Sequence, residues 1–136
     1  MRSGVRPSEP SNPKRFLSDA AYQKNLANQL AMTPQTLAEL ARVGMARDAV
    51  LPLEYFFYTN KRERAEELAE ALRGLGYSAE ARPAAPAEDS EDSFLTTGWT
   101  TPMPMDEVTV LGWTRNMAQL GFQYDCDFDG WGAHPK

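Results

Sequence analysis

Three aspartates at alternate positions near the carboxyl end of the chain form the sharpest chemical pattern in the sequence. Asp125, Asp127 and Asp129 are followed by Gly130, a spacing that copies the first half of an EF-hand calcium loop. The match fails at the twelfth position, because Lys136 stands where that loop carries a glutamate that binds calcium through both oxygens. We therefore do not expect a calcium site.

A hydrolytic enzyme is the next chemistry that these residues could serve. A metal site built from the aspartates would have His134 as its sole histidine, and Cys126 is the sole cysteine. Cys126 falls among apolar residues, where a free thiol is usually inert packing. The sequence contains no glycine-rich phosphate loop and no recognisable Ser/His/Asp constellation. We expect no catalytic residue, no cofactor and no bound metal, and hence a protein that is not an enzyme.

The same stretch has the period of a β-strand with one buried side. The apolar set is Phe122, Tyr124, Cys126 and Phe128, and the outward set is Gln123, Asp125, Asp127 and Asp129. The outward carboxylates would repel one another, so solvent or a basic partner must face them. Such a strand needs a sheet, and the sheet needs helices on its apolar face.

The strands that would pair with it follow from residue type and alternation. Residues 51–58 are apolar or aromatic on both faces and predict a strand in the interior of the sheet. A weaker strand is expected at an edge over residues 77–82. Residues 94–101 predict a further strand, with Gly98 as a bulge.

Helices are expected between these strands and before them. Helical spacing of apolar residues predicts one helix that Gly76 ends and another that Gly121 ends. Upstream, Ser18 suits the cap of a first helix, and Thr33 followed by Pro34 suits the start of a second.

The order of elements predicts an α+β fold of the ferredoxin-like βαββαβ type. Its four-stranded antiparallel sheet would carry two helices on one face, preceded by one or two amino-terminal helices. Residues 1–17 are expected to form a disordered tail, residues 18–49 a helical segment, and residues 50–136 the ferredoxin-fold domain.

Composition narrows the function classes. The 136-residue chain has a formal net charge of −5 and one cysteine. No apolar run reaches the roughly 18 residues that a membrane helix needs, and the start lacks the apolar core of a secretory signal. A cytoplasmic protein is therefore expected.

Charge is unevenly distributed along the chain. Residues 1–18 carry four basic side chains and one acidic one, whereas the remainder carries ten basic and eighteen acidic. Nucleic acid would repel so acidic a body, whereas a basic protein segment would suit it. A proline-rich loop at residues 83–93 adds the acidic residues Glu88, Asp89, Glu91 and Asp92. The simpler interpretation, that acidity only keeps the protein soluble, stays open.

Two stretches of the sequence resemble a known family. Residues 124–132, which end in Asp-Gly-Trp-Gly, are similar to the closing signature of the RraB family, regulators of ribonuclease E activity. Residues 53–58, the helix that follows them and the Gly-Tyr pair at 76–77 resemble that family's first strand, helix and glycine–aromatic turn. The resemblance covers about residues 51–136 and adds helical residues upstream.

The resemblance implies a ferredoxin-like, non-enzymatic protein. The founding member binds ribonuclease E outside its catalytic part and lowers RNA turnover by protein contact. We therefore expect a protein partner, ribonuclease E or another basic protein segment, with no direct contact to nucleic acid or membrane.

The partner-binding residues that we expect are Asp125, Asp127, Asp129 and Trp131. Trp131 suits a contact anchor, or equally a lid over the sheet edge or the core. The alternative function is a ferredoxin-like module that senses a small molecule or binds a different protein. The sequence does not determine the oligomeric state.

Overall fold

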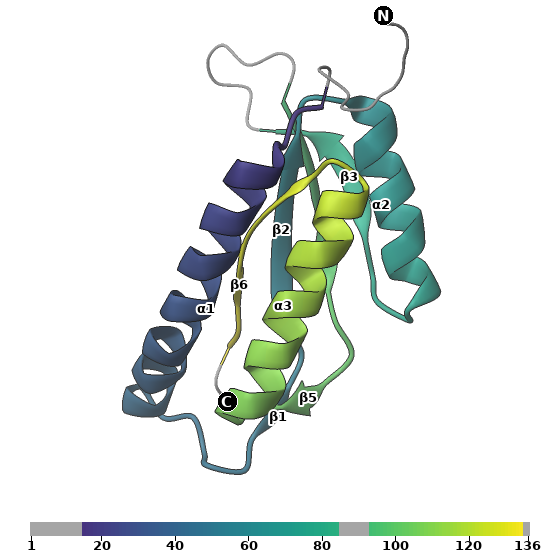
Figure 1. Ribbon diagram of the computed structural model, residues 1–136. Coiled ribbons are helices and arrows are strands. Elements are labelled where there is room, and N and C mark those ends of the chain that lie inside the picture. Colours follow the sequence, from purple (N-terminus) through teal and green to yellow (C-terminus); the bar gives the residue numbers. More distant parts are fainter. Residues whose placement is uncertain (1–14, 85–92, 135–136) are drawn as a thin grey trace, which may run out of the picture.

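The computed structural model describes residues 15–84 and 93–134 and combines helices with strands (Figure 1). In these ranges the helices α1, α2 and α3 run over Asp19–Arg42, Arg62–Gly74 and Glu107–Gln123. The strands β1 to β6 comprise Val50–Leu51, Glu54–Thr59, Glu80–Pro83, Phe94–Trp99, Met103–Pro104 and Asp127–Gly132. The acidic loop residues Glu88, Asp89, Glu91 and Asp92 lie outside the described residues, as does most of the expected tail.

Four strands form an antiparallel sheet in the order β3-β4-β2-β6, and β1 pairs with β5 in a two-stranded ribbon. The predicted interior strand is confirmed, because β2 lies between β4 and β6. Pro52 separates β1 from β2, since proline has no N–H to continue a ladder. The predicted edge strand is β3. The α+β class and the four-stranded sheet expected from the sequence are therefore present.

One face of the sheet carries α2 and α3. The Thr96 hydroxyl donates to the carbonyl of Ala65 in α2 at 2.9 Å, and its cross-strand neighbour Phe57 lies against Gly121 of α3. α1 runs beside α3 and along β6 (Figure 1). The layers enclose nearly inaccessible side chains, each contributing about 1.5–3 kcal/mol by burial, including Leu53, Tyr55, Phe57, Leu68, Leu72, Val110, Met117 and Phe128.

α1 begins where the sequence predicts, with the Ser18 hydroxyl accepting the N–H three residues on at 3.1 Å. The predicted second start at Thr33 and Pro34 is wrong, because both residues lie inside one continuous helix. Thr33 donates its hydroxyl hydrogen to the carbonyl of Gln29 and faces Thr114 of α3. Packing against α3 therefore outweighs the N–H that the proline removes.

α3 continues beyond Gly121, where the sequence predicts its end. Phe122 and Gln123 are helical and do not belong to the closing strand. A Cβ on Gly121 would lie 2.7 Å from the carbonyl oxygen of Cys126 and 2.8 Å from the Phe57 ring. Gly121 therefore allows α3 to pack closely against β2. Gly76, in contrast, follows α2 with a φ of 91°, as its predicted role at the end of that helix requires.

The sheet has its bulge in β6 and not at Gly98, where it was expected. Pairing of β2 with β4 passes through Gly98 without a shift. Glycine is required there because a Cβ would lie 2.0 Å from the carbonyl oxygen of Ser78. In β6 the register passes over Asp129, and Gly130 adopts a φ of 122° that favours glycine.

Candidate functional site

The prediction that Asp125 points outward from a strand is wrong. Asp125 follows α3 with a φ of 62° and is only 4% exposed. Its N–H donates to the carbonyl of Phe122 at 3.1 Å, and the N–H of Cys126 donates to that of Gly121 at 2.8 Å. These are the bonds of a Schellman motif, in which aspartate occupies the position usually held by glycine.

The carboxylate of Asp125 joins three parts of the chain. The backbone N–H groups of Phe16 and Leu17 each donate to it at 2.8 Å. Lys61, immediately before α2, donates at 2.8 Å, and the guanidinium of Arg15 lies 3.6 Å away. Burial would raise the pKa of Asp125, but the bonds from Lys61 and the two N–H groups outweigh it and lower that pKa. Asp125 therefore ties the chain before α1 and the start of α2 to the end of α3.

Asp127 and Asp129 do lie in β6, in different surroundings. Asn25 of α1 donates to the carboxylate of Asp127 at 2.9 Å and to the carbonyl of Phe128 at 2.7 Å, so α1 covers this edge of the sheet. Asp129 reaches solvent at the bulge. Desolvation raises the pKa of both carboxyls, and the charge of Asp129 raises that of Asp127 further.

These acidic residues do not converge on a metal position. In residues 15–84 and 93–134, no three His, Cys, Asp or Glu side chains are grouped to hold an ion. Cys126 is fully buried, as its place among apolar residues predicts. Burial, reinforced by the charge of Asp125, raises the pKa of its thiol to about 12, which makes it an unreactive packing residue.

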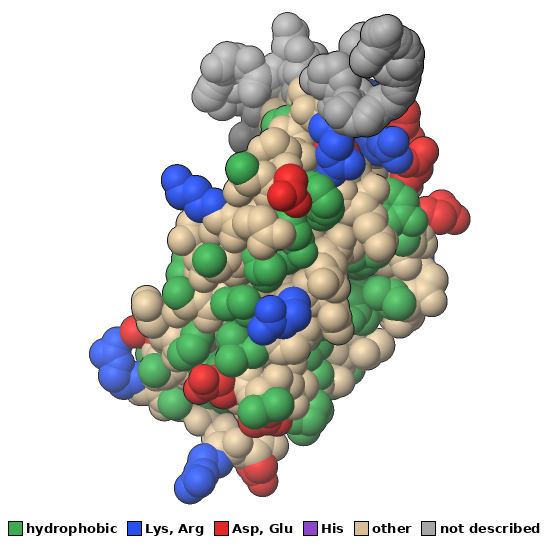
Figure 2. All heavy atoms as spheres, viewed as in Figure 1, with side chains coloured by type: hydrophobic (Ala, Val, Ile, Leu, Met, Phe, Trp, Pro, Cys, Tyr) green, Lys and Arg blue, Asp and Glu red, His purple; other side chains and the backbone are tan. Residues whose placement is uncertain are grey.

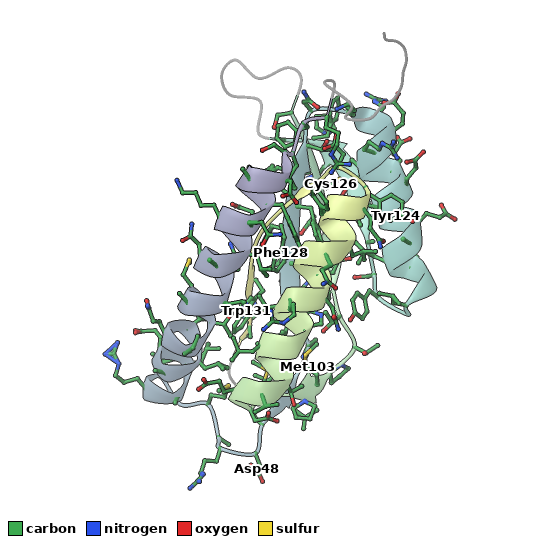
Figure 3. All side chains as sticks on the ribbon, in the orientation of Figure 1. Asp48, Met103, Tyr124, Cys126, Phe128 and Trp131 are labelled. Carbon is green, nitrogen blue, oxygen red and sulfur yellow. The ribbon has the colours of Figure 1, made fainter. Side chains whose placement is uncertain are left out.

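Trp131 lies on the helix-covered side of the sheet, between α1 and α3 (Figure 3). Its indole N–H donates to the hydroxyl of Thr33 at 3.2 Å. Its ring meets Trp113 edge-on with the centroids 6.5 Å apart. The bulge at Gly130 precedes this contact, so the Asp-Gly-Trp motif connects the last strand to two helices.

The opposite side of the sheet, here termed the open face, was not singled out from the sequence. Strand register places on it Glu54, Phe56, Tyr58, Glu80, Arg82, Leu95, Thr97 and Trp99. The aromatic side chains among these are partly exposed. β6 adds Asp127, Gly130 and Gly132. Because residues 51–58 are apolar or aromatic on both faces, the sequence alone does not tell the two sides of β2 apart, and only the register separates them.

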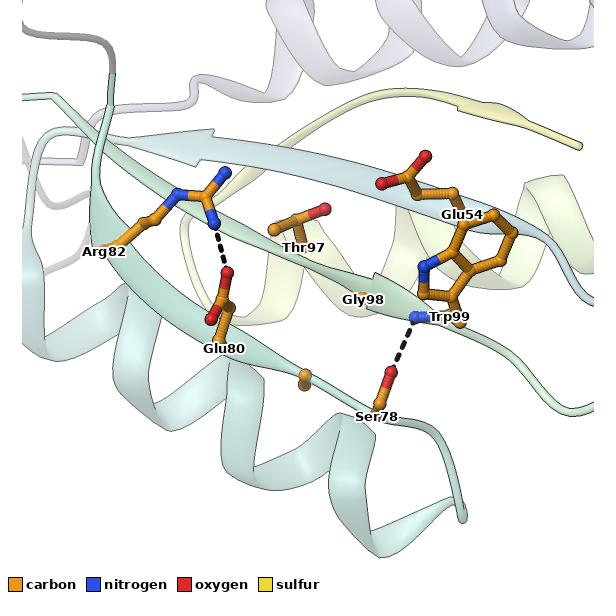
Figure 4. Close-up of a pocket in the computed structure, with 8 residues that line it drawn as sticks. Glu54, Ser78, Glu80, Arg82, Thr97, Gly98 and Trp99 are labelled. Atoms are coloured by element: carbon orange, nitrogen blue, oxygen red, sulfur yellow. Dashed lines mark hydrogen bonds and ion pairs between the residues drawn. The ribbon is translucent and has the colours of Figure 1, made fainter.

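A hollow of about 270 Å³ opens on this face (Figure 4). Its lining includes Glu54, Ser78, Glu80, Arg82, Thr97 and Trp99. Glu54 and Trp99 are cross-strand neighbours at one side, and the Arg82–Glu80 ion pair lies at the other. Within the described part of the chain, no hydrogen bond or ion pair engages the Glu54 carboxylate.

Acidic side chains also gather on the outer side of α2 (Figure 2). A wide hollow of about 560 Å³ there is lined by Glu63, Glu66, Glu67, Glu70 and Tyr124. Two of these glutamates form ion pairs with arginines one turn away along the helix. This α2 acidic face therefore presents more negative than positive charge to an approaching partner.

A family model matches most of the chain. The model is described as RraB, Regulator of ribonuclease activity B, and it matches residues 30–133. The match begins inside α1, upstream of residue 51 where the resemblance was first placed, and includes both partners of the Thr33–Trp131 hydrogen bond. No curated protein matches the chain. No helix in the described ranges is long and apolar enough to cross a membrane.

Proposed function

Because the chain belongs to the RraB family of ribonuclease regulators, we propose that it lowers RNA turnover by binding ribonuclease E and catalyses no reaction itself. The observation that carries this proposal is the match over residues 30–133, which includes α2, α3 and the whole four-stranded sheet. We also propose a cytoplasmic location, where that enzyme and its RNA substrates would be met.

An acidic surface would supply the long-range part of the contact. The net charge of −5 and the α2 acidic face support attraction of a basic protein segment. Exposed charges mainly speed the encounter and make it dependent on salt. We therefore assign the α2 acidic face to steering of the partner.

The residues expected from sequence to touch the partner divide into two groups. Asp129 is exposed and Asp127 is partly so, and both stay proposed contacts. Asp125 is buried in its own ion pairs, which favours an architectural role. The hydrogen bond of Trp131 to Thr33 likewise favours the lid interpretation over a contact anchor.

We further propose that the fold is ferredoxin-like. The strand order β3-β4-β2-β6, with every neighbouring pair antiparallel, supports this assignment. So does the location of α2 and α3 on one face of the sheet. The amino-terminal helix α1 is an addition to that unit, since it packs beside α3 and along β6.

Binding to purified ribonuclease E tests the function. We expect complex formation with the full-length enzyme, slower cleavage of a model RNA, and an association rate that falls from about 50 to about 300 mM salt. The double substitution Glu66→Lys and Glu70→Lys should reduce both the association rate and its salt dependence. A matched control, Glu39→Lys on α1, changes charge away from α2. Absence of binding would refute the function, whereas salt-independent binding would refute only the steering.

A further inference from the structure

The open face is the side of the sheet that the helices leave uncovered. α2 and α3 pack on the opposite face, and α1 follows the β6 edge. Partly exposed aromatic side chains of β2 and β4 stand on this face. His134 lies near one of them, with its ring centroid 5.6 Å from that of Trp99. Aromatic surface on a sheet with acidic neighbours suits a ligand that is both planar and cationic.

Several positions on the open face carry small side chains, which leave space above the sheet. Gly130 is the β6 neighbour of Phe56, and Gly132 is that of Glu54. A Cβ on Gly132 would meet no atom within 4 Å. On the other side, Thr97 is the β4 neighbour of Phe56. The free space is therefore greatest at Gly132, beside Glu54 and Trp99, whereas the Phe56 ring stands between Gly130 and Thr97.

Charge on the open face is predominantly negative. The described strands contribute to it three carboxylates, those of Glu54, Glu80 and Asp127, and one cation, Arg82. Arg82 already forms an ion pair with Glu80. Asp127 accepts a hydrogen bond from Asn25. The Glu54 carboxylate has no such partner among the described residues. It stands at the mouth of the hollow, beside the Trp99 ring.

We propose that the open face binds an extended, arginine-containing segment of a partner protein, with one arginine entering the hollow between Trp99 and Glu54. A guanidinium can stack on an indole while it donates two parallel hydrogen bonds to a carboxylate, and a lysine ammonium offers neither planarity nor that fork. RNA fits less well, because its phosphates would approach three carboxylates. The inference rests on the proposed function for the partner being a protein, and it names the chemistry that this partner presents.

The three indole N–H groups of the protein allow a direct test by NMR. Trp113 donates its N–H to Tyr77, and Trp131 donates to Thr33, so both are internal references. The probe is a short synthetic peptide with one arginine between serine and glycine residues, added to the full-length ¹⁵N-labelled protein. A peptide with citrulline in place of arginine keeps the shape and removes the charge. We expect the Trp99 indole signal to shift with the arginine peptide and to stay fixed with the citrulline peptide.

Two substitutions locate the binding and two controls match them. Glu54→Gln should weaken the arginine peptide about tenfold, because it removes a charge-assisted hydrogen bond. Gly132→Leu should weaken it similarly by filling the free space above the sheet at this position. Glu39→Gln, at an exposed position of α1, makes the same charge change as the first substitution. Gly112→Leu makes the same size change as the second at an exposed glycine of α3 whose Cβ would also meet no atom. Both controls should change the affinity less than about twofold.

Several results would overturn the proposal. The proposal fails if the Trp99 indole signal does not shift with the arginine peptide, or if it shifts equally with the citrulline peptide. It also fails if the signal shifts more with single-stranded oligouridine than with the arginine peptide. A Trp99 signal that changes with protein concentration alone would assign the open face to a second copy of the chain. If ribonuclease E were inhibited equally by wild type and Glu54→Gln, docking on the open face would fail while the function stood. If Trp99 responded and ribonuclease E were not bound, the function would fail instead.

Discussion

The two faces of the central sheet are built from alternate residues of the same strands and serve different ends. On the helix-covered face, Tyr55 and Phe57 of β2 are completely inaccessible. On the open face, their neighbours Glu54, Phe56 and Tyr58 are partly exposed. Core packing thus fixes the side chains of the covered face, whereas those of the open face are accessible to a partner. A single alternating strand therefore contributes one set of side chains to the core and the other to the proposed binding surface.

The carboxylates show the same contrast, and their removal should give the largest difference. Asp125→Ala deletes the acceptor of two backbone N–H groups and of Lys61, so we expect a loss of about 3–4 kcal/mol in the free energy of unfolding. Asp129→Ala, at an exposed position, should change it by less than about 0.5 kcal/mol. Urea denaturation measures both. Equal losses would contradict the division between a buried tie and a surface acid.

Acid should remove part of the Asp125 contribution. Because the folded state lowers the pKa of Asp125, its stabilisation is complete above the ordinary value near pH 4 and is lost as pH falls through the folded value. Asp127 and Asp129, whose pKa values are raised, act with the opposite sign, weakening the fold as pH rises through their folded values.

The variant Asp125→Asn isolates the first of these effects, because asparagine also tolerates a positive φ. The gap in unfolding free energy between wild type and this variant should narrow from about pH 7 to about pH 3. Asp129→Asn, run in parallel, should respond in the opposite sense, because the raised pKa of Asp129 makes its charged form a cost to the wild type at neutral pH that acid removes. A gap for Asp125→Asn that stays constant with pH would mean that its charge contributes nothing to stability.

A pair of glycines tests the two faces by size instead of charge. Gly121→Ala places a Cβ against the Phe57 ring and a backbone oxygen and should cost about 2 kcal/mol through overpacking. Gly132→Ala projects into open space and should cost less than about 0.5 kcal/mol. Thermal or urea unfolding would compare the two. Similar costs would mean that the open face is packed as tightly as the covered one.

The smallest expected effect is at Trp131. Trp131→Phe keeps an aromatic ring near Trp113 but loses the hydrogen bond to Thr33, so about 1 kcal/mol of stability should be lost. Affinity for ribonuclease E should stay within about twofold of wild type, because the ring faces the helices and not the open face. A large loss of affinity with unchanged stability would restore Trp131 as a contact anchor.

The sequence predicted the sheet well because its alternation is strong. The interior location of β2, the edge position of β3 and the burial of Cys126 and Phe128 all follow from residue type and period. The family could also be inferred from two short stretches of sequence, and the family model confirms it. These features depend on local patterns that tertiary contacts reinforce.

The wrong predictions lie where the end of a helix happens to continue the alternation of the next strand, or where a contact with a residue distant in the chain determines the structure. Phe122 and Tyr124 continue the alternation of β6 by coincidence, so the end of α3 was read as strand and Asp125 as exposed. Its partners Phe16 and Leu17 lie more than a hundred positions away in the chain. Thr33 likewise suited a helix start until its bonds to Trp131 and Gln29 were known. Local sequence carries no signal for such contacts.

The most direct test of the central claim is the rate at which ribonuclease E cleaves a model RNA as this protein is added. Regulation by protein contact predicts that cleavage slows as the enzyme becomes saturated and that excess RNA does not restore it. Glu54→Gln should shift the inhibition curve to higher protein concentration by about tenfold, and Glu39→Gln by much less. Unchanged cleavage, or inhibition that excess RNA abolishes, would contradict the account.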